Sequence, residues 1–249
     1  MSPQTGAELP GRTLIAVCTL READNVEAML RQLRRRHPAA DVLIVDDDSD
    51  DQTAAIAQRF ADSNDHAGKI DVMIRRDQPG LGYAIAATMN AAVQGGYEYL
   101  VNLDADFSHD PADIAALFAE AKRTQSDVVI GSRYVDGGRI RGWPLHRRLM
   151  SRMVNRLATW RMGLPVADCS GSMRCYRVAG LASIDPGSLT SPGYSVLEEV
   201  LMRLHQDGAT MCEVPITFTD RRDGQSKLTV REAIRSLMRI WTLGQTGPR

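Results

Sequence analysis

Short apolar runs and longer amphipathic stretches alternate along the first 131 residues, and this alternation predicts strands and helices in turn. The apolar runs predict strands at residues 13–18, 42–46, 71–75, 97–103 and 128–131. Apolar positions three and four residues apart predict helices at residues 23–36, 54–60, 81–93 and 111–123. Because repeated strand–helix–strand units require parallel pairing with crossover helices, we expect an α/β fold. Its doubly wound, mostly parallel sheet should have helices on both faces and form a single domain.

Two of these helices have recognisable start signals. Ser49 with Gln52 three residues later resembles a capping box before the second helix. Asp110 followed by Pro111 is typical of an N-cap and the first helical position. Both pairs therefore predict where a helix begins.

The chain after residue 131 has less regular patterning. Gly137-Gly138 and Gly142 mark a loop, whereas residues 145–162 and 194–206 each have a helical pattern. Near the C-terminus, apolar residues at helical spacing predict an amphipathic helix; they are Val230, Ala233, Ile234, Leu237, Met238 and Trp241. This helix could dock on its own sheet or a partner subunit, or bind a membrane surface. We therefore expect a flexible N-terminus (1–12), a main domain (13–228), and a C-terminal amphipathic helix with its tail (229–249).

Composition disfavours several classes of protein. The 249 residues contain 30 Lys and Arg against 31 Asp and Glu, and 43% are hydrophobic, which argues against a mostly disordered chain and a globally basic nucleic-acid binder. The cysteines lie far apart without a C-x-x-C motif, so neither a disulfide framework nor a zinc site is indicated. No signal-peptide pattern and no stretch of ~18 apolar residues is present. We expect a cytoplasmic protein whose membrane contact is peripheral.

Charge is unevenly distributed despite the overall balance. Residues 41–65 contain eight Asp against one Arg, whereas residues 139–177 contain nine Arg against one acid, Asp168. A solvated face explains many charge runs, but basic residues that are all Arg and are interleaved with Trp and Tyr favour phosphate recognition by planar, bidentate donors.

Acidic residues directly follow two predicted strands, at the edge where open parallel sheets bind ligands. Asp104 and Asp106 follow the fourth strand, and an extended D-x-D places both carboxylates on one side, where they can converge on a divalent cation. Two loop aspartates could instead cap the next helix, but Asp110 already provides that cap. Asp47 follows the second strand and is a second candidate for ligand binding at this edge; the alternative interpretation is a solvated turn residue.

Two other enzyme classes lack their motifs. Gly80-Leu81-Gly82 begins a helix after a strand, but Ile85 replaces the third glycine of the dinucleotide-binding pattern, and the strand is the third rather than the first. A Ser or Cys hydrolase is disfavoured because the chain has no G-x-S-x-G elbow and none of its five histidines lies in a recognisable nucleophile arrangement.

Motifs throughout the chain resemble a known family. The general ones are Asp46-Asp47-x-Ser49-x-Asp51-x-Thr53, Gly80-Leu81-Gly82, Asp104-Ala105-Asp106-Phe107-Ser108-His109-Asp110-Pro111 and Gly131-Ser132-Arg133-Tyr134. The more discriminating ones are Gly142-Trp143-x-Leu145-x-Arg147-Arg148 and Asp220-Arg221-x-x-Gly224-x-Ser226-Lys227-Leu228. With these motifs the chain resembles the family 2 glycosyltransferases of the GT-A fold, and more closely the dolichol-phosphate (polyprenol-phosphate) mannose synthases. The resemblance also extends through Asp168-x-Ser170-Gly171-Ser172-Met173-Arg174, Gly193-Tyr194, Glu199 and Val214-Pro215-Ile216-x-Phe218, and it covers about residues 13–243.

This resemblance implies a set of ligands and site residues. It implies GDP-mannose as donor, a polyprenyl phosphate as acceptor, and Mg²⁺ or Mn²⁺ held by Asp104 and Asp106, with Ser108 at a position where some members have a Gln ligand. The nucleotide side is implied to comprise Cys18, Thr19, Leu20, Glu22, Val45, Asp47 and Ala105. The residues implied to meet phosphate groups are Arg133, Arg221 and Lys227, with Arg133, Arg147 and Ser151 on the acceptor side. The chain departs from the family at residues 18–22, which are C-T-L-R-E where relatives typically have P-T-Y-N-E.

The resemblance further implies a single inverting displacement at the anomeric carbon. An acceptor phosphate is already an anion at neutral pH, so it needs no strong general base, and the Arg-rich segment would offset the repulsion between two anions and attract the lipid head group from a membrane surface. The implied location is peripheral, at the cytoplasmic face of a membrane, where a separate anchoring subunit is compatible with the sequence. Two alternatives stay open: another sugar donor such as UDP-glucose, and a catalytically silent sugar-nucleotide binding module.

Overall fold

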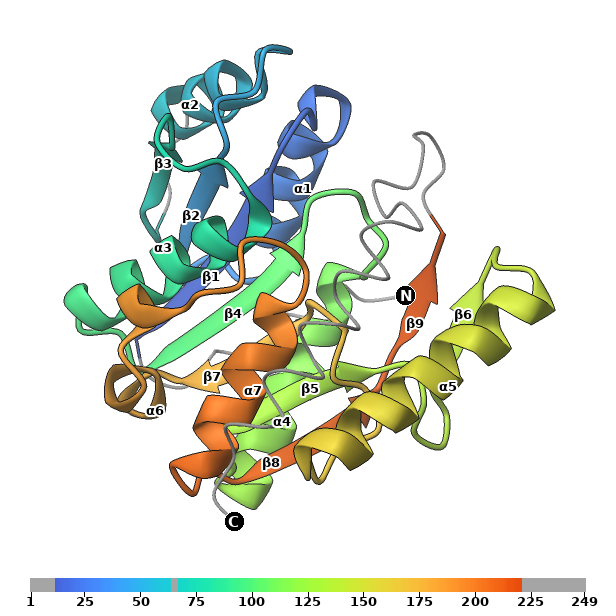
Figure 1. Cartoon of the computed structure of the whole chain (residues 1–249). Coiled ribbons are helices and arrows are strands. Elements are labelled where there is room, and N and C mark those ends of the chain that lie inside the picture. The colour runs from blue at the N-terminus through green and yellow to red at the C-terminus, as the bar shows by residue number, and fades with distance from the viewer. Residues whose placement is uncertain (1–11, 64–66, 221–249) are drawn as a thin grey trace.

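The computed structural model describes residues 12–63 and 67–220, whose strands and helices alternate over most of the chain (Figure 1). The strands are β1 (Thr13–Thr19), β2 (Asp41–Asp46), β3 (Ile70–Ile74), β4 (Tyr99–Asp104), β5 (Val128–Ser132), β6 (Arg139–Arg141), β7 (Arg174–Arg177), β8 (Met211–Pro215) and β9 (Thr217–Thr219). The helices are α1 (Ala23–Arg36), α2 (Thr53–Ser63), α3 (Leu81–Gln94), α4 (Ile114–Thr124), α5 (Leu145–Met162), α6 (Val178–Ser183) and α7 (Val196–Gln206). Two 3-10 turns, Pro111–Asp113 and Pro186–Ser188, precede α4 and α7.

A mixed, mostly parallel sheet forms the centre of the domain. Within the described residues its strand order is β3-β2-β1-β4-β7-β5-β8, and β6 pairs with β9 in a separate two-stranded sheet. All neighbours in the large sheet are parallel except β7, which runs antiparallel to both β4 and β5. The order turns outward from β1 in both directions, so the predicted doubly wound α/β fold is confirmed.

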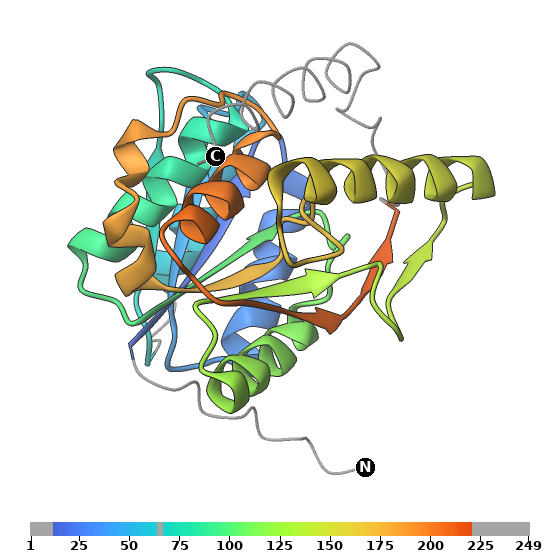
Figure 2. The same cartoon turned by 60° about the horizontal axis from the view of Figure 1, so that its bottom comes forward.

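Helices cover both faces of this sheet, and each face has its own hydrophobic core (Figure 2). Successive residues of β1 point to opposite sides, because side chains alternate along a strand. Leu14 and Ala16 contribute to the core under α3, α5, α6 and α7, whereas Ile15 and Val17 contribute to the core under α1, α2 and α4. The continuous apolar runs of the sequence therefore reflect strands that are buried on both faces.

The predicted helices and strands of the first 131 residues are present, and α1 and α5 have the predicted bounds. Asp110 caps the turn before α4 as expected, since its side chain accepts a hydrogen bond from the Ala112 N–H at 2.9 Å and Pro111 follows it. The prediction of a capping box at the start of α2 is wrong. Ser49 instead bonds to Asp46, and the Asp51 carboxylate accepts from the Thr53 N–H where the helix starts.

Several elements after residue 131 were not predicted, namely the short strands β6 to β9 and the helix α6. The proposed C-terminal helix at 229–249 and the domain boundary before it lie outside the described residues. In the part of the chain that the structure describes, no helix combines the length and apolarity needed to span a bilayer.

Candidate active site

The register of the central strands brings the predicted nucleotide loop and the D-x-D motif to one edge of the sheet. At the end of β1, Cys18 pairs with Asp104 of β4 on one side and with Val45 of β2 on the other. Burial, together with the nearby carboxylates of Asp104 and Asp47, raises the pKa of the Cys18 thiol, so this side chain stays protonated. Residues far apart in the sequence thus form one continuous surface.

The first loop is held in place by a fully buried aspartate. Asp46 accepts hydrogen bonds from the Thr19 hydroxyl at 2.7 Å, the Ser49 hydroxyl at 2.8 Å and the Ser49 N–H at 2.7 Å. The Arg21 N–H in turn donates to the Ser49 hydroxyl at 2.8 Å, and Arg21 has a φ of 57°. These contacts direct the Thr19 side chain inward, whereas the side chain of the next residue, Leu20, is exposed.

Glu22, Val45 and Ala105 lie at the same edge. The Glu22 N–H donates to the Thr53 hydroxyl at 2.9 Å, and its carboxylate accepts from Asn25 at 2.8 Å. Val45 and Ala105 are buried, so only their backbone groups are available to a ligand. The structure therefore brings together all the residues predicted for the nucleotide side.

Asp47 connects this loop to the start of α3. Its carboxylate forms an ion pair with Arg75 and accepts a hydrogen bond from the Gly80 N–H at 2.7 Å. Both charged side chains are largely buried. The sequence did not indicate Arg75 as a partner, because it lies at the end of a different strand.

The two glycines at the start of α3 are required by close contact with another loop. A Cβ on Gly82 would lie 1.9 Å from the Ser191 carbonyl oxygen, and the Gly82 N–H donates to the Pro192 carbonyl at 3.0 Å. Glu199 of α7 fixes that loop by accepting from the Ser191 N–H at 2.8 Å. The Gly-x-Gly pattern is thus explained by backbone packing rather than by dinucleotide binding.

The D-x-D motif lies at the end of β4. Asp104 accepts a hydrogen bond from the Ser172 hydroxyl at 2.7 Å, and Asp106 accepts from the Ser108 N–H at 2.9 Å. The Ser108 hydroxyl is buried beside the His109 ring, 3.2 Å from Nδ1. Burial, reinforced by the Arg133 guanidinium, lowers the pKa of His109 to about 4, so the ring is neutral at pH 7.

These donors fit a hard divalent cation such as Mg²⁺ or Mn²⁺, which prefers carboxylate and other oxygen ligands. Among residues 12–63 and 67–220, no group of three or more His, Cys, Asp or Glu side chains could hold a metal by itself. Asp104 and Asp106 would therefore supply only part of a coordination shell, and a ligand such as a diphosphate would have to complete it.

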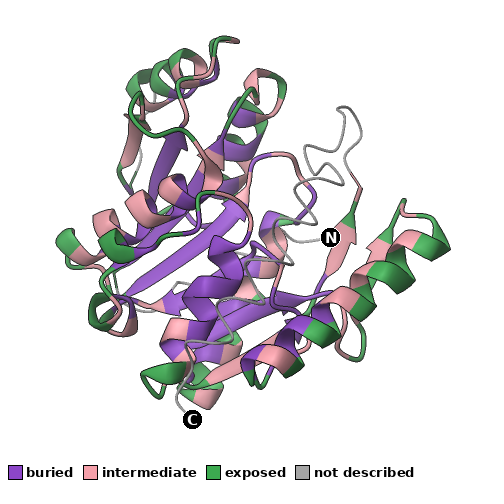
Figure 3. Cartoon of the chain, in the orientation of Figure 1, coloured by how far each residue is buried: buried purple, intermediate pink, exposed green. Residues whose placement is uncertain are grey.

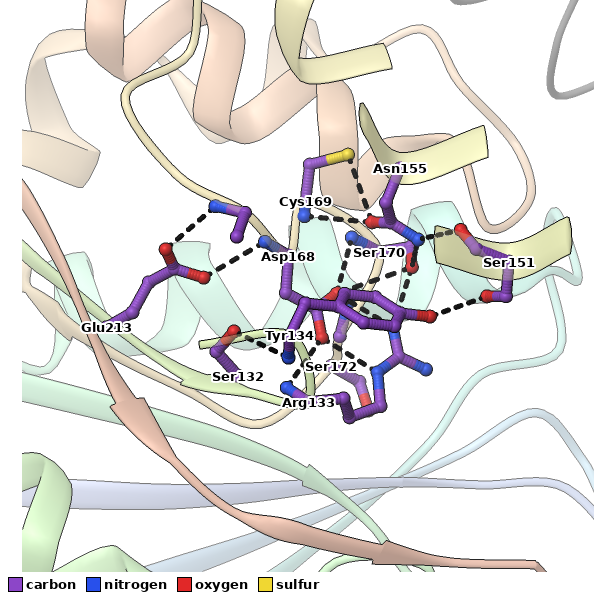
Figure 4. A network of polar contacts seen from close by, with 12 residues as sticks. Ser132, Arg133, Tyr134, Ser151, Asn155, Asp168, Cys169, Ser170, Ser172 and Glu213 are labelled. Carbon is purple, nitrogen blue, oxygen red and sulfur yellow. Dashed lines mark hydrogen bonds and ion pairs between the residues drawn. The ribbon is translucent and has the colours of Figure 1, made fainter. Parts of the chain in front are cut away.

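Arg133, which follows β5, lies in a buried polar network (Figure 4). Its Nε and Nη2 donate to the two oxygens of Asp168, both at 2.7 Å, and Nη2 also donates to the Ser170 hydroxyl at 2.7 Å. Nη1 has no hydrogen-bond partner among the described residues. Burial alone would raise the pKa of Asp168, but the Arg133 guanidinium lowers it below its ordinary value. One edge of the guanidinium is thus neutralised, and one nitrogen remains for a ligand.

A short central loop, residues 168–172, connects this network to the D-x-D motif. Glu213 holds the start of the loop by accepting from the Ala167 and Asp168 N–H groups at 2.7 and 2.9 Å. Ser172, at its other end, reaches Asp104. The resemblance noted in the sequence included neither Glu213 nor a role for this loop. The resemblance did include the sequence of the loop, as Asp168-x-Ser170-Gly171-Ser172-Met173-Arg174, but not the contacts that the loop makes.

The prediction that the Arg-rich segment faces phosphates is wrong for Arg174. This side chain is fully buried and donates to the carbonyls of Cys169, Gly171 and Leu197 at 2.6, 2.8 and 2.7 Å. It therefore fixes the central loop against α7 and does not face a ligand.

Arg147 and Ser151 lie one turn apart on α5. The Ser151 hydroxyl lies 2.7 Å from the Tyr134 hydroxyl. Arg147 stacks over the Trp143 ring at 4.0 Å and contacts the Asp220 carboxylate at 3.4 Å. One turn further on, Asn155 donates to the Ser170 hydroxyl at 3.1 Å and accepts from the Cys169 N–H at 3.1 Å. Of the predicted acceptor-side residues, Arg133 thus contacts the central loop directly and Ser151 is connected to it through Asn155, whereas Arg147 contacts Trp143 and Asp220. Arg221 and Lys227 lie outside the described residues.

Comparisons with known proteins agree with this arrangement. A family model described as glycosyl transferase family 2 matches residues 14–184. The chain is 35% identical over 226 residues to the polyprenol monophosphomannose synthase of Mycolicibacterium smegmatis, covering 90% of this chain and 84% of the relative. It is 36% identical over 235 residues to the undecaprenyl-phosphate mannosyltransferase of Micrococcus luteus, covering 93% and 94%.

Solved structures share the fold at low sequence identity. Glucosyl-3-phosphoglycerate synthase from Mycobacterium tuberculosis, in complex with Mn²⁺, UDP and glucosyl-3-phosphoglycerate, matches with a TM-score of 0.63 and 15% identity, covering 96% of this chain and 82% of that one. Mannosyl-3-phosphoglycerate synthase from Rubrobacter xylanophilus matches with a TM-score of 0.66 and 16% identity, covering 94% and 73%.

Proposed function

The chain belongs to glycosyl transferase family 2 and is a glycosyltransferase with the GT-A fold, and from this premise we propose that it transfers mannose from GDP-mannose to a polyprenyl monophosphate. The observation that carries the proposal is the 35–36% identity, over at least 90% of the chain, to two relatives whose names specify mannose and a polyprenyl phosphate. The match therefore includes the acceptor-side segment as well as the nucleotide side.

We place the nucleotide at the edge formed by β1, β2 and β4. Residues 18–22, Asp47 and the backbone of Val45 and Ala105 would surround the guanosine. Asp47 supports this arrangement, because it ties the first two strand ends to the turn before α3. The exposed Leu20 would then contact the base at the position where relatives typically have Tyr.

Asp104 and Asp106 would hold Mg²⁺ or Mn²⁺ together with the donor diphosphate. Such a cation, when bound, stabilises the negative charge that grows on the leaving diphosphate. Ser172 orients Asp104 through a hydrogen bond, and the Ser108 N–H orients Asp106.

The acceptor phosphate would bind between Arg133, Arg147 and Ser151. The free Nη1 of Arg133 supports this assignment, because a phosphate oxygen can accept a hydrogen bond from it without displacing Asp168. Arg221 and Lys227 would contact phosphate groups from outside the described part of the chain. In the reaction, an acceptor phosphate oxygen forms a bond to the anomeric carbon as the bond from that carbon to the diphosphate oxygen breaks, so the configuration inverts and GDP leaves.

We further propose that the protein works at the cytoplasmic face of a membrane, peripherally or with a membrane-anchoring subunit. Its acceptor is a lipid, and the Arg-rich α5 has no acidic residue to repel an anionic surface.

The proposal is tested by incubating the full chain with labelled GDP-mannose, Mn²⁺ or Mg²⁺ and a short polyprenyl phosphate, with UDP-glucose in parallel. We expect labelled lipid from GDP-mannose alone, and none after EDTA is added. Asp104→Asn should lower turnover by ~10²-fold or more if this carboxylate binds the catalytic cation. Labelled lipid from UDP-glucose alone would show that UDP-glucose, and not GDP-mannose, is the donor. Nucleotide binding without any product would favour a silent binding module, which the altered loop at residues 18–22 would then explain.

A further inference from the structure

Four aromatic rings lie between the loop after the D-x-D motif and the two arginines that we place on the acceptor phosphate. They form what we call the aromatic cluster: His109, Tyr134, Trp143 and Phe218. All four belong to the motifs found in the sequence, yet the proposed reaction gives a role to none of them. Their contacts indicate what the rings do.

Phe218 lies at the centre of the aromatic cluster. Its ring packs edge-on against the His109 ring, with centroids 5.3 Å apart and an interplanar angle of 79°. It meets the Trp143 ring at 5.3 Å and 66°. The guanidinium carbon of Arg133 lies over the same ring, 5.4 Å from its centroid. Phe218 therefore contacts the donor-side loop, the segment before α5 and an acceptor-side arginine at once.

Backbone hydrogen bonds fix the position of Phe218. The residue lies in β9, where it pairs with Ile140 of β6, and the next residue, Thr219, donates its N–H to the Ser108 carbonyl at 3.0 Å. This small sheet is half-buried or exposed, in contrast to the buried central strands of the large sheet (Figure 3). Neither Phe218 nor Trp143 belongs to the two hydrophobic cores. Packing of a core therefore does not explain these rings.

Both acceptor-side arginines rest against the aromatic cluster. Arg133 lies over Phe218 and also 5.2 Å from the centroid of the Tyr134 ring. Arg147 lies over the Trp143 ring at 4.0 Å. A guanidinium is attracted to the negative face of a ring, and this contact uses none of its N–H groups, which point outward in its plane. Rings can thus hold an arginine in place and leave its donors to a phosphate.

A carboxylate in place of these rings would work against the site. Asp168 already neutralises Arg133, and a further negative charge beside it would repel a bound phosphate. Arg147 contacts Asp220, but at 3.4 Å and with both side chains 38% exposed, so this pair is weak. The Trp143 indole N–H has no hydrogen-bond partner in the described part of the chain. Ring contacts rather than a hydrogen bond therefore hold the indole against its arginine.

We propose that Phe218 and Trp143 are positioning residues for the acceptor phosphate. Their rings hold the guanidiniums of Arg133 and Arg147 at a fixed separation and leave N–H groups available to a phosphate monoester. The inference deepens the proposed function and rests on it for the identity of the ligand, a prenyl phosphate. Because the central ring also packs against His109, it relates the acceptor arginines to the donor-side loop.

Calorimetric titration of the full chain with geranyl phosphate, a short prenyl phosphate, measures its Kd without turnover. Phe218→Leu removes the ring but keeps an apolar side chain, and it should raise this Kd about tenfold while leaving the Kd for GDP-mannose unchanged. Phe218→Tyr keeps the ring and should keep the affinity. The matched control is Phe60→Leu, because the Arg31 guanidinium lies over the Phe60 ring at the same 5.4 Å but between α1 and α2. It should leave the Kd for geranyl phosphate unchanged.

A fluorinated ring separates the electrostatic role from packing. Pentafluorophenylalanine at position 218 is close to Phe in size, but its fluorines reverse the charge distribution of the ring, so its face repels a guanidinium. The Kd for geranyl phosphate should rise about as much as in Phe218→Leu, without a change in the unfolding midpoint. Trp143→Leu should likewise weaken binding about tenfold, and Trp143→Phe should weaken it less.

Four results would overturn the proposal. Unchanged affinity in Phe218→Leu would show that the ring does not hold the acceptor arginines. Normal affinity with the fluorinated ring would reduce Phe218 to a packing residue. An equal loss in Phe60→Leu would show a general destabilisation. The absence of geranyl phosphate binding by the unaltered protein would remove the ligand itself.

Failure of the proposed function has a different signature. The unaltered protein would then transfer no mannose, although it binds geranyl phosphate and Phe218→Leu weakens that binding. Normal mannose transfer together with unchanged affinity in Phe218→Leu would instead refute this inference and leave the proposed function standing.

Discussion

Replacing Asp168 by Asn is expected to destabilise the domain strongly. Asp168 is fully buried and accepts hydrogen bonds from the Arg133 guanidinium at 2.7 Å and from the N–H groups of Arg133 and Gly171 at 3.1 and 3.0 Å. An Asn amide would place N–H donors against these donors and leave the Arg133 charge without its partner. Breaking a buried pair in this way costs about 3–5 kcal/mol of the free energy of unfolding.

The pH dependence of this loss provides a second measurement. The pKa of Asp168 is lowered in the folded protein although burial alone would raise it, because Arg133 stabilises the carboxylate. Its stabilisation is therefore fully present above the unfolded value of about 4 and is lost as the pH falls through the lower folded value. The difference in unfolding free energy between the unaltered protein and Asp168→Asn should shrink below about pH 4.

Denaturant unfolding followed by tryptophan fluorescence at several pH values measures both effects. The control is Glu27→Gln, which removes an exposed ion pair with Arg31 on α1 and should cost less than about 1 kcal/mol. At neutral pH and low temperature, the folded fraction of Asp168→Asn should also have a higher KM for the polyprenyl phosphate, because Arg133 is no longer oriented. A destabilisation no larger than that of the control would show that the ion pair does not hold this region together.

Three further predictions concern other parts of the domain. Burial raises the pKa of Glu198 from 4.5 to about 7 in the folded protein, so the folded state loses stability as the pH rises through that range and the carboxyl ionises. Because Gln does not ionise, the free energy of unfolding of Glu198→Gln should rise by about 3 kcal/mol relative to that of the unaltered protein between about pH 4 and about pH 8. A constant difference between the two proteins would contradict this. Gly82→Ala should cost about 1–3 kcal/mol in thermal unfolding, because its Cβ would meet the Ser191 carbonyl, whereas Gly193→Ala, with nothing within 4 Å, should cost less. Lys227→Ala should lower kcat about tenfold or more without a change in the unfolding midpoint, and normal kcat would remove Lys227 from the site.

The parts of the fold that sequence patterns predicted are those set by local interactions. Residues 13–18 and 128–131 are continuous apolar runs because β1 and β5 are buried on both faces of the sheet, so each pattern is complete within a few residues. β7 was missed because it has only four residues and an Arg at each end. Arg174 can occupy a fully buried strand position only because three backbone carbonyls from other segments accept its hydrogen bonds, and no local pattern contains that information.

The candidate site likewise has one part that the sequence could predict and another that it could not. Asp47 and Asp104 could be predicted because ligands of open parallel sheets bind beyond the carboxyl ends of strands, a position that each strand fixes for itself. The partners of these residues could not be predicted, because Arg75 reaches Asp47 from the end of β3 and Ser172 reaches Asp104 from a loop 68 residues away. The same limit to prediction applies to Arg133. Its position directly after β5 follows from the local sequence, but its neutralisation by Asp168 depends on the path of residues 163–173.

The central loop explains how one domain can hold two anionic substrates at a fixed separation. Its residue Asp168 fixes Arg133, which we place on the acceptor phosphate, and its residue Ser172 contacts Asp104, which we place on the donor diphosphate. Arg174 holds the loop to α7 and Asn155 holds it to α5, so neither end can shift without breaking buried hydrogen bonds. In-line displacement gains most when the reacting groups are held by such packed, hydrogen-bonded elements rather than by flexible side chains.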